Sequence, residues 1–191
     1  MRWLVLYARS RRMPVSAAAV VLAALAVWAL EQGGVKGGEP AIAVMLLTAS
    51  VAAASAGLGG QDTTLDRTAA IRWLPRRLVH VLLIGAVAGA AALAAVQAAG
   101  HGTVPTALVV RDGAGLAGLA ALGAVLCGAP FAWIPPTGWL TFALLVPPPG
   151  GTVGEVAAWM VLQPETALST GTPWLLLGVG TVLYAVAGPR R

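Results

Sequence analysis

The chain alternates between long apolar runs and short polar segments. A helix needs about twenty mostly apolar residues to cross a bilayer, so runs near this length predict membrane-spanning helices. A shorter run at 139–146 sits between prolines. It is extended back through Ile134, crosses where the bilayer is thinned, or forms half of a re-entrant hairpin. The longer runs lie at about 14–30, 40–58, 78–99, 113–131 (or 133) and 173–187.

Ten of the twelve basic residues fall into three clusters that apolar runs separate. Lysine and arginine next to a span are retained in the cytoplasm, so all three clusters are expected on that side. The loop at 100–112, which holds Arg111 and Asp112, is then expected outside. The clusters are Arg2, Arg9, Arg11 and Arg12; Arg67, Arg72, Arg76 and Arg77; and Arg190 and Arg191.

The charge pattern also determines whether the number of membrane crossings between two loops is odd or even. An outer loop at 100–112 and a cytoplasmic tail require an odd number of crossings between them, so the short run at 139–146 is counted as one. The sequence therefore predicts an all-α, polytopic integral membrane helix bundle in the cell membrane, with about six transmembrane helices and both termini cytoplasmic. Four spans plus an uncharged hairpin are the alternative.

Composition supports a membrane protein. Apolar residues make up 58% of the chain and charged residues 10%, with a mean hydropathy of +0.83, whereas a soluble domain carries about 25% charged residues. The length fits a single transmembrane domain, 1–191. The net charge of +5 comes from arginines beside spans, which indicates contact with anionic membrane lipids and not with nucleic acid. The single cysteine, Cys127, is expected to be a small, buried apolar side chain.

Two segments on the predicted cytoplasmic side have patterns of their own. Residues 2–13 mix arginines with large apolar side chains and predict an interfacial helix. Residues 61–77 form the longest basic loop. Within it, Thr63-x-x-Asp66 resembles a capping box, which predicts a short helix that Pro75 breaks.

The predicted outer side has one long segment, residues 147–172, which is rich in proline and partly apolar. We expect a short helix there at about 153–162, carrying Trp159. In the last span, Trp174 and Tyr184 are expected at opposite membrane interfaces, where aromatic side chains with a polar group are enriched.

Small residues recur at four-residue spacing within the predicted spans. This spacing lets helix backbones approach closely in a membrane. A chain rich in alanine and glycine also produces it by chance. The spacing occurs at Gly85-x-x-x-Gly89, Ala114-x-x-x-Gly118 and Ala124-x-x-x-Gly128.

Several kinds of chemistry are missing from the sequence. There is no GxxxxGK[ST] loop and no HExxH motif, so the chain is not expected to hydrolyse ATP by itself or to be a metalloenzyme. With Arg111 and Asp112 assigned to a loop, the spans contain none of the Asp, Glu or Arg that mark proton relays and ion paths. We therefore expect no enzyme activity, no cofactor and no metal. His80 and His101 are interpreted as solvated side chains at the ends of the third span.

The loop at 61–77 is the best functional candidate in the sequence. A protein without its own energy source needs a partner, and a short capped helix between two spans can act as a lever in a groove of a soluble ATPase. An ordinary basic loop that only sets topology is the alternative. The residues expected to dock the ATPase are Asp62, Leu65, Asp66, Arg67, Arg72 and Trp73.

The arrangement resembles the permease subunits of ABC-2-type transporters, in a small actinobacterial form. The amphipathic start, Arg2–Met13, is similar to the family's N-terminal connecting helix. The loop at 61–73 falls where its coupling helix lies, and the stretch at 147–172 resembles its outer re-entrant helices.

This resemblance implies that the protein is a permease subunit of an ABC-type exporter. The partners implied are separate ABC ATPase subunits and a second permease, either another copy or a related subunit. The cargo would be an amphiphilic small molecule or a peptide. A non-transporting membrane scaffold, or an assembly protein of a larger complex, is the competing hypothesis because it needs only helix-packing faces.

Overall fold

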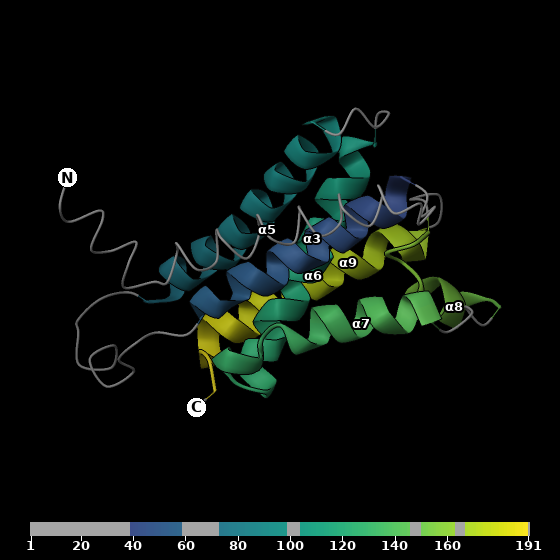
Figure 1. Ribbon diagram of the computed structural model, residues 1–191. Coiled ribbons are helices and arrows are strands. Elements are labelled where there is room, and N and C mark those ends of the chain that lie inside the picture. The colour runs from purple at the N-terminus through teal and green to yellow at the C-terminus, as the bar shows by residue number, and fades with distance from the viewer. Residues whose placement is uncertain (1–38, 59–72, 99–103, 146–149, 163–166, 191) are drawn as a thin grey trace.

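The computed structural model describes residues 39–58, 73–98, 104–145, 150–162 and 167–190 (Figure 1). Every element assigned in these ranges is a helix, which confirms the all-α class for this part of the chain. The predicted interfacial helix at 2–13 and first span at 14–30 lie outside the described residues. The elements are α3 (Glu39–Ser55), η1 (Ala56–Leu58), α5 (Trp73–Ala98), α6 (Thr106–Leu126), η2 (Ala129–Phe131), α7 (Ile134–Leu145), α8 (Thr152–Ala157) and α9 (Ala167–Ala187).

Four of the described helices are long and apolar enough to cross a membrane. They correspond to the second, third, fourth and last predicted spans, so the prediction of a membrane protein agrees with their length and composition. The candidate spans are Ala41–Leu58, Leu74–Gln97, Thr106–Leu126 and Ala167–Ala187.

Two of these helices begin earlier than predicted, because a proline expected at a boundary is included. Pro75 is the third residue of α5, and a proline in the first turn removes no helical hydrogen bond. The prediction that Pro75 breaks a helix is therefore wrong. Pro173 lies farther inside α9, which starts at Ala167. The hydroxyl of Thr172, the residue immediately before it, donates to the Leu168 carbonyl at 2.8 Å.

The short run between prolines forms α7, which begins at Ile134 with Pro135 and Pro136 in its first turn. The helix therefore extends back through Ile134, as in one of the three alternatives. Its 12 residues rise about 18 Å at 1.5 Å per residue, less than the ~30 Å of a hydrocarbon core. In Figure 1, α7 starts near the end of the bundle where the C-terminus lies and runs toward α8.

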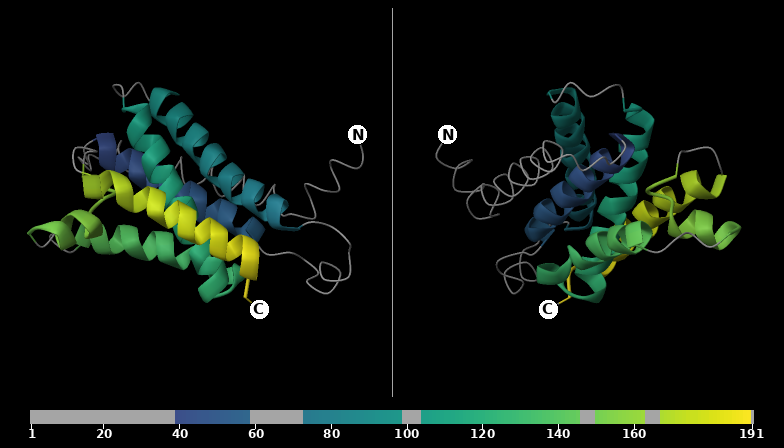
Figure 2. Two further views of the ribbon diagram at one scale, coloured as in Figure 1. Left: turned by 180° about the vertical axis from the view of Figure 1, so that it is seen from behind. Right: turned by 45° about the vertical axis from the view of Figure 1, so that its right-hand side comes forward.

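Helix α6 lies at the centre of the described bundle. It packs against α3, α5, α7 and α9, and most of its surface is buried, whereas α5 and α9 leave most of theirs uncovered. The two views in Figure 2 show α3, α5 and α9 surrounding it.

A close helix crossing joins α6 to α9 through two glycines. A Cβ at Gly180 would collide with the Gly118 carbonyl, and a Cβ at Gly118 would collide with the backbone of Leu176. Gly85 approaches α6 less closely, since a Cβ there would lie 3.4 Å from the Gly113 oxygen, at van der Waals contact. Of the small residues that the four-residue spacing singled out, Gly118 therefore lies at a close helix crossing.

Two sequence predictions fail at the end of the bundle that holds the C-terminus. Cys127 is exposed, because α6 ends at Leu126 and the chain turns at Gly128, whose φ of +97° takes it out of the helix. Tyr184 is not exposed on the surface of α9, as an aromatic residue in contact with headgroups would be. Its side chain is buried, and its hydroxyl donates to the Leu58 carbonyl at 2.7 Å.

Gly180→Ala is expected to lower the free energy of unfolding by about 1–3 kcal/mol, because an added methyl group overpacks the crossing. Gly178→Ala is the matched control. It lies on the same helix, and a methyl group there meets no atom within 4 Å. Thermal unfolding in one detergent compares the two variants with the wild type. Equal melting temperatures for both variants would contradict the close crossing.

Candidate functional site: a buried arginine–aspartate pair

Arg111 and Asp112 lie in the second turn of α6, inside a candidate span. Their side chains are 3% and 0% exposed. The prediction that they occupy an outer loop is wrong, and so is the prediction that the spans carry no Arg or Asp. The cause is the position of the helix start. Pro105, with φ −57°, precedes the first turn, so α6 begins at Thr106 and not near residue 113.

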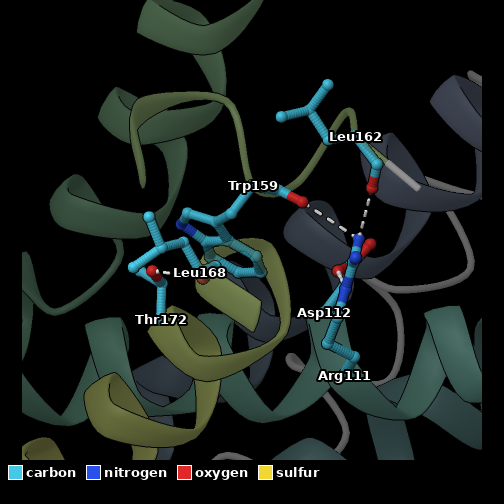
Figure 3. A network of polar contacts seen from close by, with 6 residues as sticks. All are labelled: Arg111, Asp112, Trp159, Leu162, Leu168 and Thr172. Atoms are coloured by element: carbon cyan, nitrogen blue, oxygen red, sulfur yellow. Dashed lines mark hydrogen bonds and ion pairs between the residues drawn. The ribbon is translucent and has the colours of Figure 1, made fainter. Parts of the chain in front are cut away.

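The guanidinium of Arg111 has three described partners (Figure 3). Its Nε donates to Asp112 Oδ1 at 2.8 Å. Its Nη2 donates to the carbonyl oxygens of Trp159 at 2.9 Å and Leu162 at 2.8 Å. A charged group at bilayer depth is costly unless it pairs with another charge or with backbone carbonyls, and Arg111 does both.

These bonds attach residues 150–162, which we name the outer segment after the side predicted for them, to the centre of the bundle. The predicted short helix is present as α8, but Trp159 lies in the turn that follows it. Its side chain is fully buried. Gly115, one turn after Arg111, makes room for the ring, because a Cβ there would collide with Trp159 Cη2 and Pro173. Arg111 thus holds the backbone of Trp159, and Gly115 accommodates its side chain.

A second contact on the outer segment comes from α7. The indole Nε1 of Trp139 donates to the Ala157 carbonyl at 3.0 Å. The carbonyls at the end of α8 and in the following turn are therefore bound by side chains of two different helices. Because a short isolated helix has little stability of its own, these bonds help to determine where α8 lies.

Two polar atoms of the pair, Arg111 Nη1 and Asp112 Oδ2, are buried without a partner in the part of the chain described. The same part contains no group of three His, Cys, Asp or Glu side chains that could hold a metal ion. The pair as a whole is neutral. Its clearest chemical property is that of a clamp, in which a fixed guanidinium fork binds a carboxylate and two carbonyls.

The opposite end of the bundle is held together around the last turn of α9. The Tyr184 hydroxyl bonds the Leu58 carbonyl, and Arg77 Nη1 donates to the Ala185 carbonyl at 3.3 Å. Gly188 follows with φ +74° and donates to the Tyr184 carbonyl at 2.9 Å, an arrangement typical of helix C-termini. A Cβ at Gly188 would lie 2.8 Å from Arg77 Nη1, so a side chain there would displace the arginine.

The C-terminal tail reaches the end of α6 at the same place. The Arg190 N–H donates to the Ala124 carbonyl at 2.9 Å. The last turn of α9, the first turns of α5 and the end of α6 meet here. We name this end of the bundle the basic end. Arginines from two of the three predicted cytoplasmic clusters therefore lie together, as their assignment to one side requires.

The predicted ATPase-docking residues are outside this description. Trp73 is the first residue of α5, but its side chain is not described. The others lie in the segment 59–72, which falls outside the described residues; they are Asp62, Leu65, Asp66, Arg67 and Arg72.

Sequence reasoning missed the buried pair because it treated two adjacent charges as a loop. One signal was present: Ala107–Val110 is apolar and continues without glycine or proline into Arg111.

Comparison of the chain with protein-family models, with curated proteins and with solved structures finds no match.

Arg111→Met is expected to lower the free energy of unfolding by about 3–5 kcal/mol, because Asp112 becomes a buried charge without its partner. Adding Asp112→Asn to the same chain removes that charge and should restore part of the loss. Arg190→Met, at an exposed arginine, is the control and should cost less than about 1 kcal/mol.

Thermal unfolding followed by tryptophan fluorescence measures all three variants. If the double variant is no more stable than Arg111→Met alone, the two side chains are not coupled as described. A wild-type melting temperature for Arg111→Met would contradict the clamp itself.

Proposed function

We propose that the protein is the membrane-spanning permease subunit of an ABC-type exporter, driven by a separate ATPase. The cargo would be an amphiphilic small molecule or a peptide. The observation that carries the proposal is that described residues on either side of the segment 59–72 bond the same turn of α9. Leu58, before this segment, bonds Tyr184; Arg77, shortly after it, bonds Ala185.

This attachment would allow the segment 59–72 to transmit movement to α9. If a partner displaces the segment 59–72, the end of η1 and the start of α5 move with it. Hydrogen bonds from both sides carry that movement to adjacent residues of α9. A loop that only obeyed topology would need neither contact, so the attachment favours the lever over the alternative.

Helix α9 then links the two ends of the bundle. Its first residues follow the outer segment, and Pro173 packs beside Trp159 against Gly115. Movement of α9 along its axis or across α6 therefore acts directly on the segment that Arg111 clamps. In the proposed exporter, this outer segment is the part that opens or closes the exit when the ATPase acts.

The proposal includes a full topology of six spans in the cell membrane, with α7 and the run at 14–30 completing the count. Positive residues beside spans favour the cytoplasm, so the basic end is assigned there. A second permease, identical or related, and two ATPase subunits complete the complex.

The partner is tested by purifying the tagged protein in mild detergent and identifying co-purifying proteins that carry a GxxxxGK[ST] motif. We expect one ATPase to co-purify, and Arg67→Glu with Arg72→Glu to abolish its binding, because charge reversal disrupts complementary pairs at an interface. Arg190→Glu, which reverses an exposed charge at the basic end, is the control and should retain the ATPase.

Coupling is tested with Tyr184→Phe, which removes only the hydroxyl that bonds Leu58. Binding of the ATPase should persist, while ATP-driven export in reconstituted vesicles should decrease.

If no ATPase co-purifies and the charge reversal has no effect, the permease proposal fails. Recovery of a larger complex whose activity survives ATP depletion would instead favour the scaffold.

A further inference from the structure

The side of α3 that faces away from the bundle differs from the outer sides of α5 and α9. Helix α3 contacts α6, and it also contacts α5 and α7, which lie on either side of it (Figure 1). Outward-facing residues of α5 and α9, such as Val87 and Leu175, are exposed. By contrast, no residue of 41–55 in α3 is exposed. The outer side of α3 is therefore partly covered, and those of α5 and α9 are not.

The residues of α3 form two faces. The buried face is broad and is centred on Ala43, Leu47 and Val51. The partly buried residues, except Ala54, recur at three- or four-residue spacing and so form a strip on the opposite side, which we name the α3 strip. The strip is apolar and consists mostly of alanine. Its members are Ala41, Ile42, Met45, Ala49, Ala52 and Ala53.

A helix is the neighbour that fits the α3 strip. Alanines on the outside of a bundle are exposed where nothing lies against them, as Ala86 and Ala90 are on α5. Ala49 and Ala52 are not exposed, so another element lies beside them. Small residues let helix backbones approach closely in a membrane, where packing drives association.

The chain that precedes α3 supplies such a helix. Residues 1–38 come before α3 and contain the apolar run 14–30, which is a predicted span. Only the segment 31–38 separates this run from Glu39, where α3 begins. A connection of about two to eight residues commonly joins two neighbouring, antiparallel helices of a bundle. Position along the chain therefore favours α3 as the helix against which this run packs.

The direction of α3 agrees with this assignment. Helix α3 leads into Leu58, which bonds Tyr184 at the basic end. A span that precedes α3 and runs antiparallel to it begins at the basic end. The arginine cluster at 2–12 then lies at the same end as Arg77 and Arg190, as the assignment of all three clusters to one side requires.

We propose that residues 14–30 pack antiparallel against the α3 strip, with 31–38 as the turn between the two helices. The assignment goes beyond the transport function and does not depend on it. The apolar groove lined by α5, α6 and α9 is the competing location. Its lining residues Ala86 and Ala90 are exposed, which favours the α3 strip over the groove.

Disulfide cross-linking in native membranes tests the location. In a Cys127→Ser background, Ala49→Cys is combined with a cysteine at each position of 18–25 in turn, which samples every side of the helix over two turns. A protease site inserted in 31–38 allows linked fragments to be recognised, because they stay together on a non-reducing gel. Links to position 49 should form at positions three or four residues apart and not at those between them. Ala90→Cys, in the groove, is the control and should form none.

Three results would overturn the proposal. Links to position 90 and none to position 49 would place the run 14–30 in the groove. No link to position 49, or equal links from all positions of 18–25, would mean that the run presents no fixed face to α3. Links to position 49 that form only between two copies, each carrying one of the cysteines, would show that a second chain covers the strip.

Discussion

The arrangement of the described bundle depends on satisfying one buried guanidinium. Arg111 lies in a helix that is otherwise apolar, and hydrocarbon offers it no hydrogen bonds. Asp112 neutralises its charge, and two carbonyls from the outer segment take its remaining described bonds. Because water cannot replace those carbonyls at depth, the outer segment is held against α6 and not released as a surface loop.

This constraint combines with the glycine crossing of α6 and α9. Gly115 accepts the Trp159 ring beside Pro173, and Gly118 meets Gly180 farther along the same pair of helices. At the other end, Tyr184 and Ala185 of α9 bind residues on either side of the segment 59–72. One helix thus contacts residues that flank the proposed ATPase-facing segment and also contacts the outer segment, which gives the transport proposal a mechanical basis.

The sequence predicts the helical membrane class because long apolar runs have few other solutions. It fails where a residue's partner is distant in the chain. Hydropathy alone counts Arg111 as unfavourable in a membrane span, because the Trp159 carbonyl that accepts its hydrogen bond is 48 residues away in the sequence. It likewise places Tyr184 at an interface, since its acceptor at Leu58 is 126 residues away. Pro173 is mistaken for a boundary because its packing against Gly115 comes from another helix.

The clamp is tested most directly by thiol labelling of the outer segment. In a Cys127→Ser background, Met160→Cys probes a position that is 1% exposed, and Val161→Cys probes its neighbour, which is 39% exposed. With Arg111 present, maleimide should label position 161 and leave position 160 unmodified; with Arg111→Met, both should react. Equal labelling of position 160 with and without Arg111 would contradict the account.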